Sequence, residues 1–546
     1  KYGDAFRFIL ARGATSAAIG TDQLGARRAA EGDEVGPYPY FCCEIGGGME
    51  TSYHRRIDMM PMDVGSAALV KIGSGNNLQG YYMYHGGTNP NGKLSTLQES
   101  QRTQYWNDVP VKSYDFQAPL GEFGQIRPHY HWLRRMHLFL HDWGATLATQ
   151  SARLPVITPA DSHDTATLRW SARTDGQSGF VFINNYQRLQ PMPAREGLQF
   201  RLRLKEGDLT FPEQPFTVPA DSVFCWPFHL DLGGATLIYV TAQPVCRVKE
   251  GKTAYVVFAQ TAGLPAEFVF DSHGITVESA TGQVMKAEGR IAVRQVKPGT
   301  GAALRLHTAN GIINLVLLDE AQSLACWKGA LEGRDRLFLT RAGLTLDHNT
   351  LSLCASDPAD LTVGIFPPPA ELTGDSGRIS ESNDGLFRRY TITPSPVDAL
   401  TATLEMVRAA GPPRKIATGS QGVAEAPSDE DFGQAGVWRI KLPESVPPDR
   451  DLLLRIRYVG DVARLYLGET FLTDNFYNGQ PFEIGLKRYA PDIYRKELRL
   501  EILPLRKDAP FYMPQSAWPD FGDAQSALHI AGVEVVDRHT VRLDAR

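Results

Sequence analysis

The sequence predicts a multidomain protein with an α/β part first and several antiparallel β domains after it. Its 546 residues are enough for about three to five domains of roughly 100–200 residues each. The composition changes near residue 155, where Gly-rich, aromatic loops and one clear helix give way to short runs of Val, Ile, Leu, Phe and Thr. Such runs, separated by Pro, Gly and Asp at short intervals, are typical of β-sandwiches.

One strand–helix–strand unit is predicted in the first part of the chain. Tyr40–Cys43 is a short apolar run, as in a parallel strand that is buried on both faces. A helical stretch from about Pro61 to Ile72 follows, and a second apolar, aromatic strand starts at Leu78. The clearest helix is expected at 129–150, where apolar residues form a broad face and Gly144 is expected to end the helix.

The rest of the chain predicts β domains joined by linkers. Pro-rich stretches at 366–369 and 411–414 have the composition of linkers, and the small, polar residues at 415–432 favour a domain boundary. Alternating apolar and polar residues at 452–458 predict strands beyond that boundary. The expected units are an α/β segment at 1–150, a β domain at 151–250, one or more β-sandwiches at 251–425 and a further β domain at 426–546.

Charge and hydropathy argue against two classes of partner. The net charge is -5, the isoelectric point is about 6.3 and the basic residues are scattered, which argues against nucleic acid. No apolar run approaches the roughly 18 residues that a membrane span requires. No signal peptide is expected at Lys1–Asp4, because no apolar segment follows these residues.

Glu44 is the best candidate for catalysis. It directly follows the apolar run Tyr40–Cys43, and barrels of parallel strands place their chemistry at the C-terminal ends of the strands. Gly46–Gly48 comes next, and glycines let a backbone pass close to a ligand. The nearest rival is Glu50, which lies beyond the glycines in a polar loop, whereas Glu122 is expected to form a structural salt bridge.

Two later segments mix aromatic and polar residues. Leu78–Asn89 is an aromatic strand that ends in Gly-Gly and polar residues, and 111–124 alternates aromatic and polar side chains in a loop. Sugar sites use this mixture, because rings stack on the apolar faces of a sugar while polar groups bind its hydroxyls. These segments therefore predict a carbohydrate site near Glu44.

Three motifs in this part of the chain resemble those of family 35 β-galactosidases, in the same order. Cys43–Gly48 resembles the nucleophile strand of bacterial and fungal-like members. Tyr82–Asn89, Tyr-Met-Tyr-His-Gly-Gly-Thr-Asn, resembles the Tyr-Met-Phe-His-Gly-Gly-Thr-Asn block. Ser113–Leu120 resembles the Ser-Tyr-Asp-Tyr-Asp-Ala-Pro-Leu that follows it.

The resemblance implies both a fold and an activity. The fold would be the C-terminal part of a (β/α)8 TIM barrel at 1–150, followed by several antiparallel β-sandwich and jelly-roll domains, with a galactose-binding type of jelly roll at 426–546. The family is exo-acting and retaining, and it hydrolyses terminal β-D-galactosyl residues of oligosaccharides or glycoconjugates through a covalent glycosyl-enzyme. We expect no cofactor and no metal. We expect a periplasmic or extracellular location.

The resemblance also assigns roles to individual residues. Glu44 would be the nucleophile. Tyr82, Tyr114, Phe116 and Asn89 would bind the substrate, with Tyr82 close enough to the nucleophile to orient its carboxylate. Phe116 departs from the family pattern, which usually has Tyr there, so a hydrogen bond found in relatives is expected to be absent. Gln117 stands where the family usually has Asp.

The acid/base glutamate is expected outside this chain. In the family it belongs to an Asn-Glu pair at the end of an earlier barrel strand. No such pair stands in a suitable place before Glu44, and 1–43 has room for at most one strand, around 17–20. Three parallel strands cannot close a barrel, because the open edges would expose unpaired backbone groups. We therefore expect the acid/base and the earlier strands to come from residues ahead of Lys1 or from a separate polypeptide.

Two alternatives stay open. One is a non-catalytic galactoside-binding protein on the same scaffold, and an Asn-Glu pair at an upstream strand end would favour the enzyme over it. The other is a structural β-sandwich protein without a sugar site, which leaves the aromatic segments at 81–89 and 113–119 without an explanation.

Overall fold

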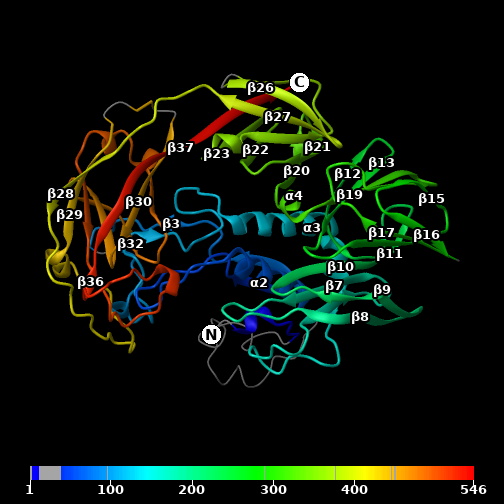
Figure 1. Ribbon diagram of the computed structural model, residues 1–546, viewed down its shortest axis with the longest axis horizontal. Coiled ribbons are helices and arrows are strands. Elements are labelled where there is room, and N and C mark those ends of the chain that lie inside the picture. The colour runs from blue at the N-terminus through cyan, green and yellow to red at the C-terminus, as the bar shows by residue number, and fades with distance from the viewer. Residues whose placement is uncertain are drawn as a thin grey trace.

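The computed structural model describes residues 3–10, 39–94, 96–287, 289–374, 377–443, 446–447 and 450–546. Strands are the commonest elements among these residues, and the β domains are arranged in an arc around two central helices (Figure 1). The strand expected around 17–20 lies outside the described residues. Among the helices of the described part, none is long and apolar enough to cross a membrane.

The predicted strand–helix–strand unit is present. Strand β1 (Tyr40–Ile45) pairs in parallel with β2 (Asn76–Tyr81), and helix α2 (Pro61–Gly73) lies between them in sequence. The prediction that this strand is buried on both faces is wrong for the described residues, since Phe41 is 59% exposed and Leu78 on β2 is 48% exposed. Within the described part of the chain, no third strand pairs with β1 or β2, so they form a two-stranded sheet.

Two helices connect this unit to the β domains. Helix α2 begins at Pro61, a residue favoured in the first helical turn, and is buried along most of its length. Helix α3 (Pro128–Thr149) buries Leu133, Met136, Phe139, Trp143 and Leu147 at spacings of three and four residues. Gly144 does not end α3. Apolar residues on both sides of it are buried, and the stabilisation from their packing exceeds the roughly 1 kcal/mol that an interior glycine costs.

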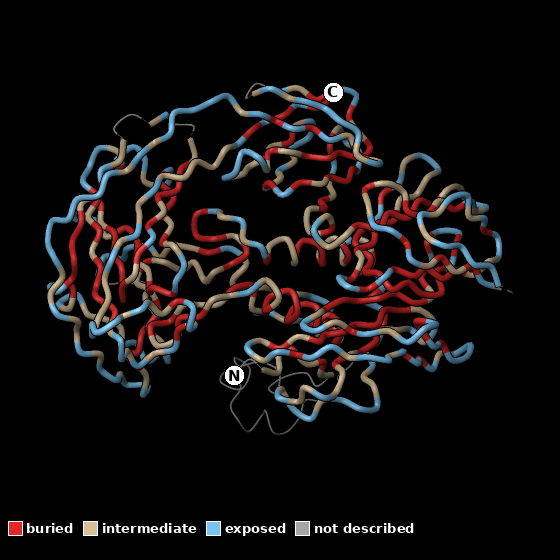
Figure 2. Tube along the Cα trace, in the orientation of Figure 1, coloured by how far each residue is buried: buried red, intermediate tan, exposed pale blue. Residues whose placement is uncertain are grey.

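The first β domain is built on an eight-stranded sheet that packs against both helices. Its core cluster joins residues of α2 and α3 to the inner faces of the strands (Figure 2). A long hairpin, β8 (Arg195–Leu204) and β9 (Gly207–Val218), covers its other face. The sheet contains β5 (Ser151–Arg153), β6 (Trp170–Thr174), β7 (Gly179–Asn185), β10 (Ser222–Asp231), β11 (Thr236–Val240), β14 (Ala266–Asp271), β16 (Gln283–Ala287) and β17 (Arg290–Val296).

Two five-stranded sheets follow. The short helix α4 (Glu320–Leu324) separates them in sequence, and Arg134 of α3 donates a 3.0 Å hydrogen bond to the Cys326 carbonyl where the second sheet begins. The first contains β12 (Ala242–Glu250), β13 (Thr253–Gln260), β15 (Ile275–Ala280), β18 (Leu304–Thr308) and β19 (Gly311–Leu318). The second contains β20 (Cys326–Leu331), β21 (Arg334–Leu339), β24 (Thr362–Phe366), β26 (Gly377–Asp384) and β27 (Phe387–Pro394).

The last strand, β37 (His529–Ala545), links two parts of the molecule. One part of it pairs with β30 (Asp451–Val459), and its C-terminal part pairs with β23 (Thr350–Ala355). In Figure 1 it runs as a long red arrow from one β domain to the next. Its six-stranded sheet also contains β22 (Gly343–Asp347), β25 (Leu372–Gly374) and β33 (Phe482–Gly485).

A five-stranded sheet completes the C-terminal domain opposite β30 and β33. Residues of both sheets share one hydrophobic core, which is the arrangement of a β-sandwich. The strands are β28 (Thr403–Arg408), β29 (Gly436–Lys441), β31 (Val462–Leu467), β32 (Thr470–Phe476) and β34 (Leu498–Ile502). The expectation of several β domains after the first part of the chain is thus confirmed. The domain limits that we placed stay predictions.

Candidate active site

The parallel pairing of β1 and β2 places Glu44 and Tyr82 at one edge. Ile45 is in register with Tyr81, and the Tyr82 amide donates a 3.0 Å hydrogen bond to the Ile45 carbonyl. Glu44 therefore lies at the C-terminal end of its strand, where its side chain is exposed, and Tyr82 is 38% exposed beside it. This is the edge at which parallel-strand enzymes place reactive groups.

Two of the three glycines after Glu44, Gly47 and Gly48, make room for protein, contrary to our expectation that they make room for a ligand. A Cβ atom on Gly48 would overlap the Phe116 carbonyl oxygen and would lie 2.8 Å from the Ala118 backbone. A Cβ atom on Gly47 would lie 2.5 Å from the Met83 carbonyl oxygen. Glycine at position 48 lets the loop that carries Phe116 pack directly on the chain after Glu44, and glycine at position 47 does the same for the backbone at Met83.

Three of the predicted substrate-binding residues form one aromatic group. The hydroxyls of Tyr82 and Tyr114 lie 2.5 Å apart in a hydrogen bond. The Phe116 ring lies 5.5 Å from the Tyr82 ring, edge to face, and 4.4 Å from the Tyr114 ring. Strand β4 (Ser113–Tyr114) pairs with β3 (Gly87–Thr88), which holds the two aromatic segments together.

Gln117 fixes the position of Phe116. Both residues have positive φ angles, 55° at Phe116 and 48° at Gln117, a region that non-glycine residues seldom adopt. The Gln117 side chain accepts a 3.0 Å hydrogen bond from the Met59 amide and donates to Thr51 Oγ1 and the Ile57 carbonyl. These bonds stabilise the strained turn, which gives a structural reason for an amide at this position.

Three carboxylates lie near enough to Tyr82 to affect the pKa of its hydroxyl. Burial raises the pKa of Tyr82, and the charges of Glu99, Glu44 and Glu50 raise it further, whereas its hydrogen bond with Tyr114 lowers it. Glu99 also accepts a 3.3 Å hydrogen bond from the Tyr114 hydroxyl. Our sequence analysis did not identify Glu99, which lies in a loop with no local motif and reaches the site only through the fold.

Glu50 differs from Glu44 in its surroundings. Its pKa is raised, mainly by burial and to a lesser extent by Glu99, although Arg55 and a hydrogen bond from Asn107 lower it. Glu50 thus lies close to Tyr82 in a drier environment than the exposed Glu44.

Asn89 is the last residue of the second motif and directly follows β3. Its side-chain amide donates a 3.1 Å hydrogen bond to the Val111 carbonyl, and its backbone amide donates to the Lys112 carbonyl at 2.8 Å. These bonds fasten the two aromatic segments to each other. A contact between Asn89 and a ligand stays a prediction.

Glu122 forms the structural contacts that we expected. It accepts hydrogen bonds from the Thr88 and Ser113 hydroxyls and lies 3.7 Å from the guanidinium of Arg488. Burial raises its pKa to about 7 despite these partners.

The site segment is fastened to the C-terminal β domain by buried polar contacts. Asp474 of β32 accepts hydrogen bonds from three successive backbone amides, those of Val111 at 2.6 Å, Lys112 at 2.9 Å and Ser113 at 3.0 Å. Arg56 forms an ion pair with Asp461 in which both side chains are at most 3% exposed. These contacts position the loop before Tyr114 from a domain more than 300 residues away in sequence.

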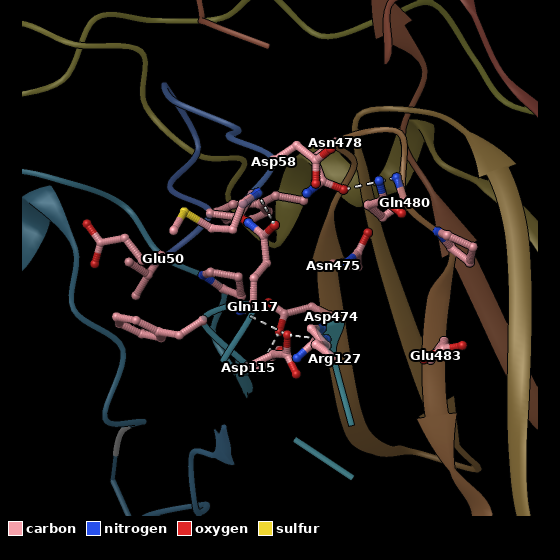
Figure 3. A pocket seen from close by; sticks show the side chains of 18 of the residues that line it. Glu50, Asp58, Asp115, Gln117, Arg127, Asp474, Asn475, Asn478, Gln480 and Glu483 are labelled. Carbon is pink, nitrogen blue, oxygen red and sulfur yellow. Dashed lines mark hydrogen bonds and ion pairs between the residues drawn. The ribbon is translucent and has the colours of Figure 1, made fainter. Parts of the chain in front are cut away.

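A cleft with a volume of about 450 Å3 lies along this contact (Figure 3). Glu50, Phe116 and Gln117 line it from the site segment. Residues from β30, β32 and the following loop line it from the C-terminal domain. The cleft and the aromatic group therefore share Phe116.

Comparison with known proteins gives two findings. The family model for glycosyl hydrolases family 35 matches residues 12–140, which confirms the resemblance drawn from the three motifs. Among solved structures, the GH31 alpha-xylosidase from Xanthomonas citri aligns with 72% of this chain at 8% identity and a TM-score of 0.11. The alignment covers 38% of that chain, and at this TM-score it carries no argument.

Proposed function

We propose that the chain acts as a retaining exo-glycosidase on terminal β-D-galactosyl residues, on the premise that its residues 12–140 match the family model for glycosyl hydrolases family 35. The observation that carries the proposal is the position of Glu44 at a parallel strand end, next to the group formed by Tyr82, Tyr114 and Phe116. We further propose that β1, α2 and β2 are part of a (β/α)8 barrel whose other strands lie outside the described residues.

In the first half-reaction the Glu44 carboxylate attacks the anomeric carbon. A bond forms between a Glu44 oxygen and that carbon as the bond to the leaving-group oxygen breaks, and the leaving oxygen takes a proton from the acid/base glutamate. Water then attacks the same carbon, gives its proton to the acid/base and releases Glu44. The configuration is retained because the carbon is displaced twice.

The tyrosines have a defined part in this scheme. The ordinary pKa of tyrosine, 10, already leaves the Tyr82 hydroxyl protonated at neutral pH, and its raised pKa keeps it so. Its one proton can be donated to the nucleophile or to a sugar hydroxyl when the Tyr114 hydroxyl donates to Tyr82 instead of to Glu99. Tyr114, whose pKa is also raised by burial, holds the Tyr82 hydroxyl in place. Phe116 offers an apolar ring with no hydroxyl, so it contributes contact area rather than a hydrogen bond.

The acid/base is proposed to come from residues outside this chain, and Glu50 and Glu99 are not assigned to that role. Retention requires the two catalytic carboxyls to lie about 5–5.5 Å apart. A structure of the full-length protein that places a second glutamate at that separation from Glu44 supports the assignment.

Hydrolysis of a nitrophenyl β-galactoside by the full-length protein tests the proposal. Glu44→Gln removes the nucleophile while keeping the size of the side chain, and we expect the rate to fall on the order of 10⁴-fold. Glu196→Gln, on an exposed carboxylate in β8, serves as the matched control and should keep the original rate. Equal rates for Glu44→Gln and the unaltered protein would remove Glu44 from the mechanism. If the galactoside binds without turnover, the non-catalytic galactoside-binding alternative is supported instead.

A further inference from the structure

The cleft between the site segment and the C-terminal β domain has the size of a small-molecule site. Its volume of about 450 Å3 falls within the roughly 300–1,000 Å3 that such sites occupy. One wall includes Glu50, Asp58 and Phe116, and the other includes Asn475 and Gln480. Figure 3 shows these labelled polar side chains gathered from the two domains around one space.

Most of the charges in the cleft are balanced within the protein. Asp115 pairs with Arg127 at 2.8 Å, and Arg455 pairs with Glu483 at 2.7 Å. Asp474 is occupied by three backbone amides. A charged ligand would have to compete with these partners, and burial raises the pKa of Glu50 and Asp58 and so disfavours their charged forms. The lining therefore favours a neutral, polyhydroxylated molecule.

Two amide side chains are oriented by the fold of the C-terminal domain. Tyr458 donates a 2.7 Å hydrogen bond to Asn475 Oδ1, so the amide nitrogen of Asn475 points away from Tyr458. The Gln480 backbone amide donates a 3.1 Å hydrogen bond to Asn478 Oδ1, and the Gln480 side chain hydrogen-bonds to Asp58 across the cleft. Amides paired with carboxylates are donors and acceptors that suit sugar hydroxyls.

Phe116 connects the cleft to the proposed galactose site. Its ring packs edge to face on Tyr82, and the same residue lines the cleft. Glu50 also lines the cleft and lies close enough to Tyr82 to affect its pKa. The cleft thus begins where the aromatic group beside Glu44 ends.

We propose that this cleft holds the leaving-group sugar of a β-galactoside, so that Asn475 and Gln480 of the C-terminal domain help to select the sugar next to galactose. The inference rests on the proposed function of the Glu44 site. It predicts that the C-terminal domain discriminates between substrates that share galactose and differ in the sugar attached to it.

Binding of two sugars to the Glu44→Gln form of the full-length protein tests this inference, because that form should not consume its ligands. Lactose carries a second sugar, and free galactose does not. We expect Asn475→Ala with Gln480→Ala to raise the dissociation constant of lactose about 10-fold, since about two hydrogen bonds are lost. Free galactose has no second sugar to occupy the cleft. Its dissociation constant should therefore change less than about twofold, well below the tenfold change that about 1.4 kcal/mol produces.

Two controls separate the possible causes. Gln480 is exposed, so Gln480→Ala alone should weaken lactose binding without disturbing the core, whereas Asn475 also contacts Tyr458. Asn310→Ala, on an exposed hairpin of another domain, should leave both constants unchanged. Equal losses for lactose and galactose, unchanged lactose binding, or no lactose binding to the Glu44→Gln form would each overturn the proposal. Failure of the proposed function appears separately, as an unchanged hydrolysis rate in Glu44→Gln.

Discussion

At the scale of single residues, the site depends on hydroxyls that cannot ionise at neutral pH. Tyr82 and Tyr114 share a hydrogen bond, and burial and nearby carboxylates raise the pKa of both. A phenol in this state is a dependable hydrogen-bond donor to an anion or a sugar hydroxyl. The role of Tyr82 is therefore in orientation, and its loss should weaken catalysis without abolishing it.

Replacement of Tyr82 by Phe tests this role. The change removes one hydrogen bond to a charged group, which is worth about 1.5–3 kcal/mol, so kcat/KM for a nitrophenyl β-galactoside should fall roughly 10- to 100-fold. Tyr84→Phe is the matched control, because Tyr84 packs with Tyr81 and Tyr130 in the helix-facing core. An equal loss in both variants would indicate a structural effect rather than orientation of the nucleophile.

Glu122 provides a prediction about pH and stability. Its pKa of about 7 in the folded protein lies above the ordinary value of 4.5, mainly because of burial. Folding thus favours the protonated form of Glu122. Its contribution to the free energy of unfolding is fully present below pH 4.5 and is lost as the pH rises through 7. The loss is on the order of 3 kcal/mol at high pH.

The Glu122→Gln variant should flatten this pH dependence. A neutral amide cannot ionise, so its thermal midpoint should change less between pH 5 and pH 8.5 than that of the unaltered protein. Parallel curves for the two proteins over this range would show that Glu122 is not the group responsible.

The sequence was sufficient to place Glu44, Tyr82, Tyr114 and Phe116 near one another, because their motifs are local. It was not sufficient for Glu99 or for Asn475 and Gln480. Glu99 lies in an irregular loop, and the two amides line the cleft from a domain that is hundreds of residues away. Contacts of this kind follow from tertiary packing, which no short pattern records.

At the scale of secondary structure elements, the Gly46–Gly48 segment decides whether the aromatic loop can dock. The predicted strand, helix and second strand are present, and the helix expected at 129–150 is α3. The burial predicted for β1 was wrong, because an apolar run indicates a tendency to be covered and does not show which segment covers it. We expected the glycines to leave space for a ligand, whereas the backbone of Met83 fills the space at Gly47 and the backbone of Phe116 and Ala118 fills it at Gly48.

Gly48→Ala tests the docking of that loop. The new Cβ atom would overlap the Phe116 carbonyl, and overpacking of this kind costs about 1–3 kcal/mol. We expect a lower thermal midpoint together with weaker galactoside binding, since Phe116 must move. Gly87→Ala is the control, because a Cβ atom there meets nothing within 4 Å. Equal behaviour of the two variants would contradict the close packing described here.

At the scale of the whole molecule, the C-terminal β domain is built into the site segment rather than attached to it. Arg56 and Asp461 pair in a buried setting, where Arg56 also donates to the Asp461 and Tyr477 carbonyls and Tyr53 donates to Asp461. Strand β37 in turn joins this domain to the sheet that contains β23. Disruption of the buried pair should therefore affect the site as well as the domain.

Asp461→Asn measures this coupling. Removing one charge of a buried pair leaves Arg56 uncompensated and costs about 3–5 kcal/mol, so the thermal midpoint and galactoside binding should both fall. Asp208→Asn breaks the exposed pair with Arg201 and should cost less than about 1 kcal/mol. Loss of stability with unchanged galactoside binding would contradict the link between the domain and the site.

The most direct test of the central claim is covalent trapping of Glu44. A 2-deoxy-2-fluoro-β-galactoside with a dinitrophenyl leaving group needs little help from a general acid, and the fluorine slows hydrolysis of the glycosyl-enzyme. After incubation of the full-length protein and digestion, mass spectrometry should find one fluorogalactosyl unit on the peptide that contains Glu44 and none in the Glu44→Gln variant. Labelling of a different carboxylate, such as Glu50, or no labelling of a protein that hydrolyses β-galactosides, would contradict the account.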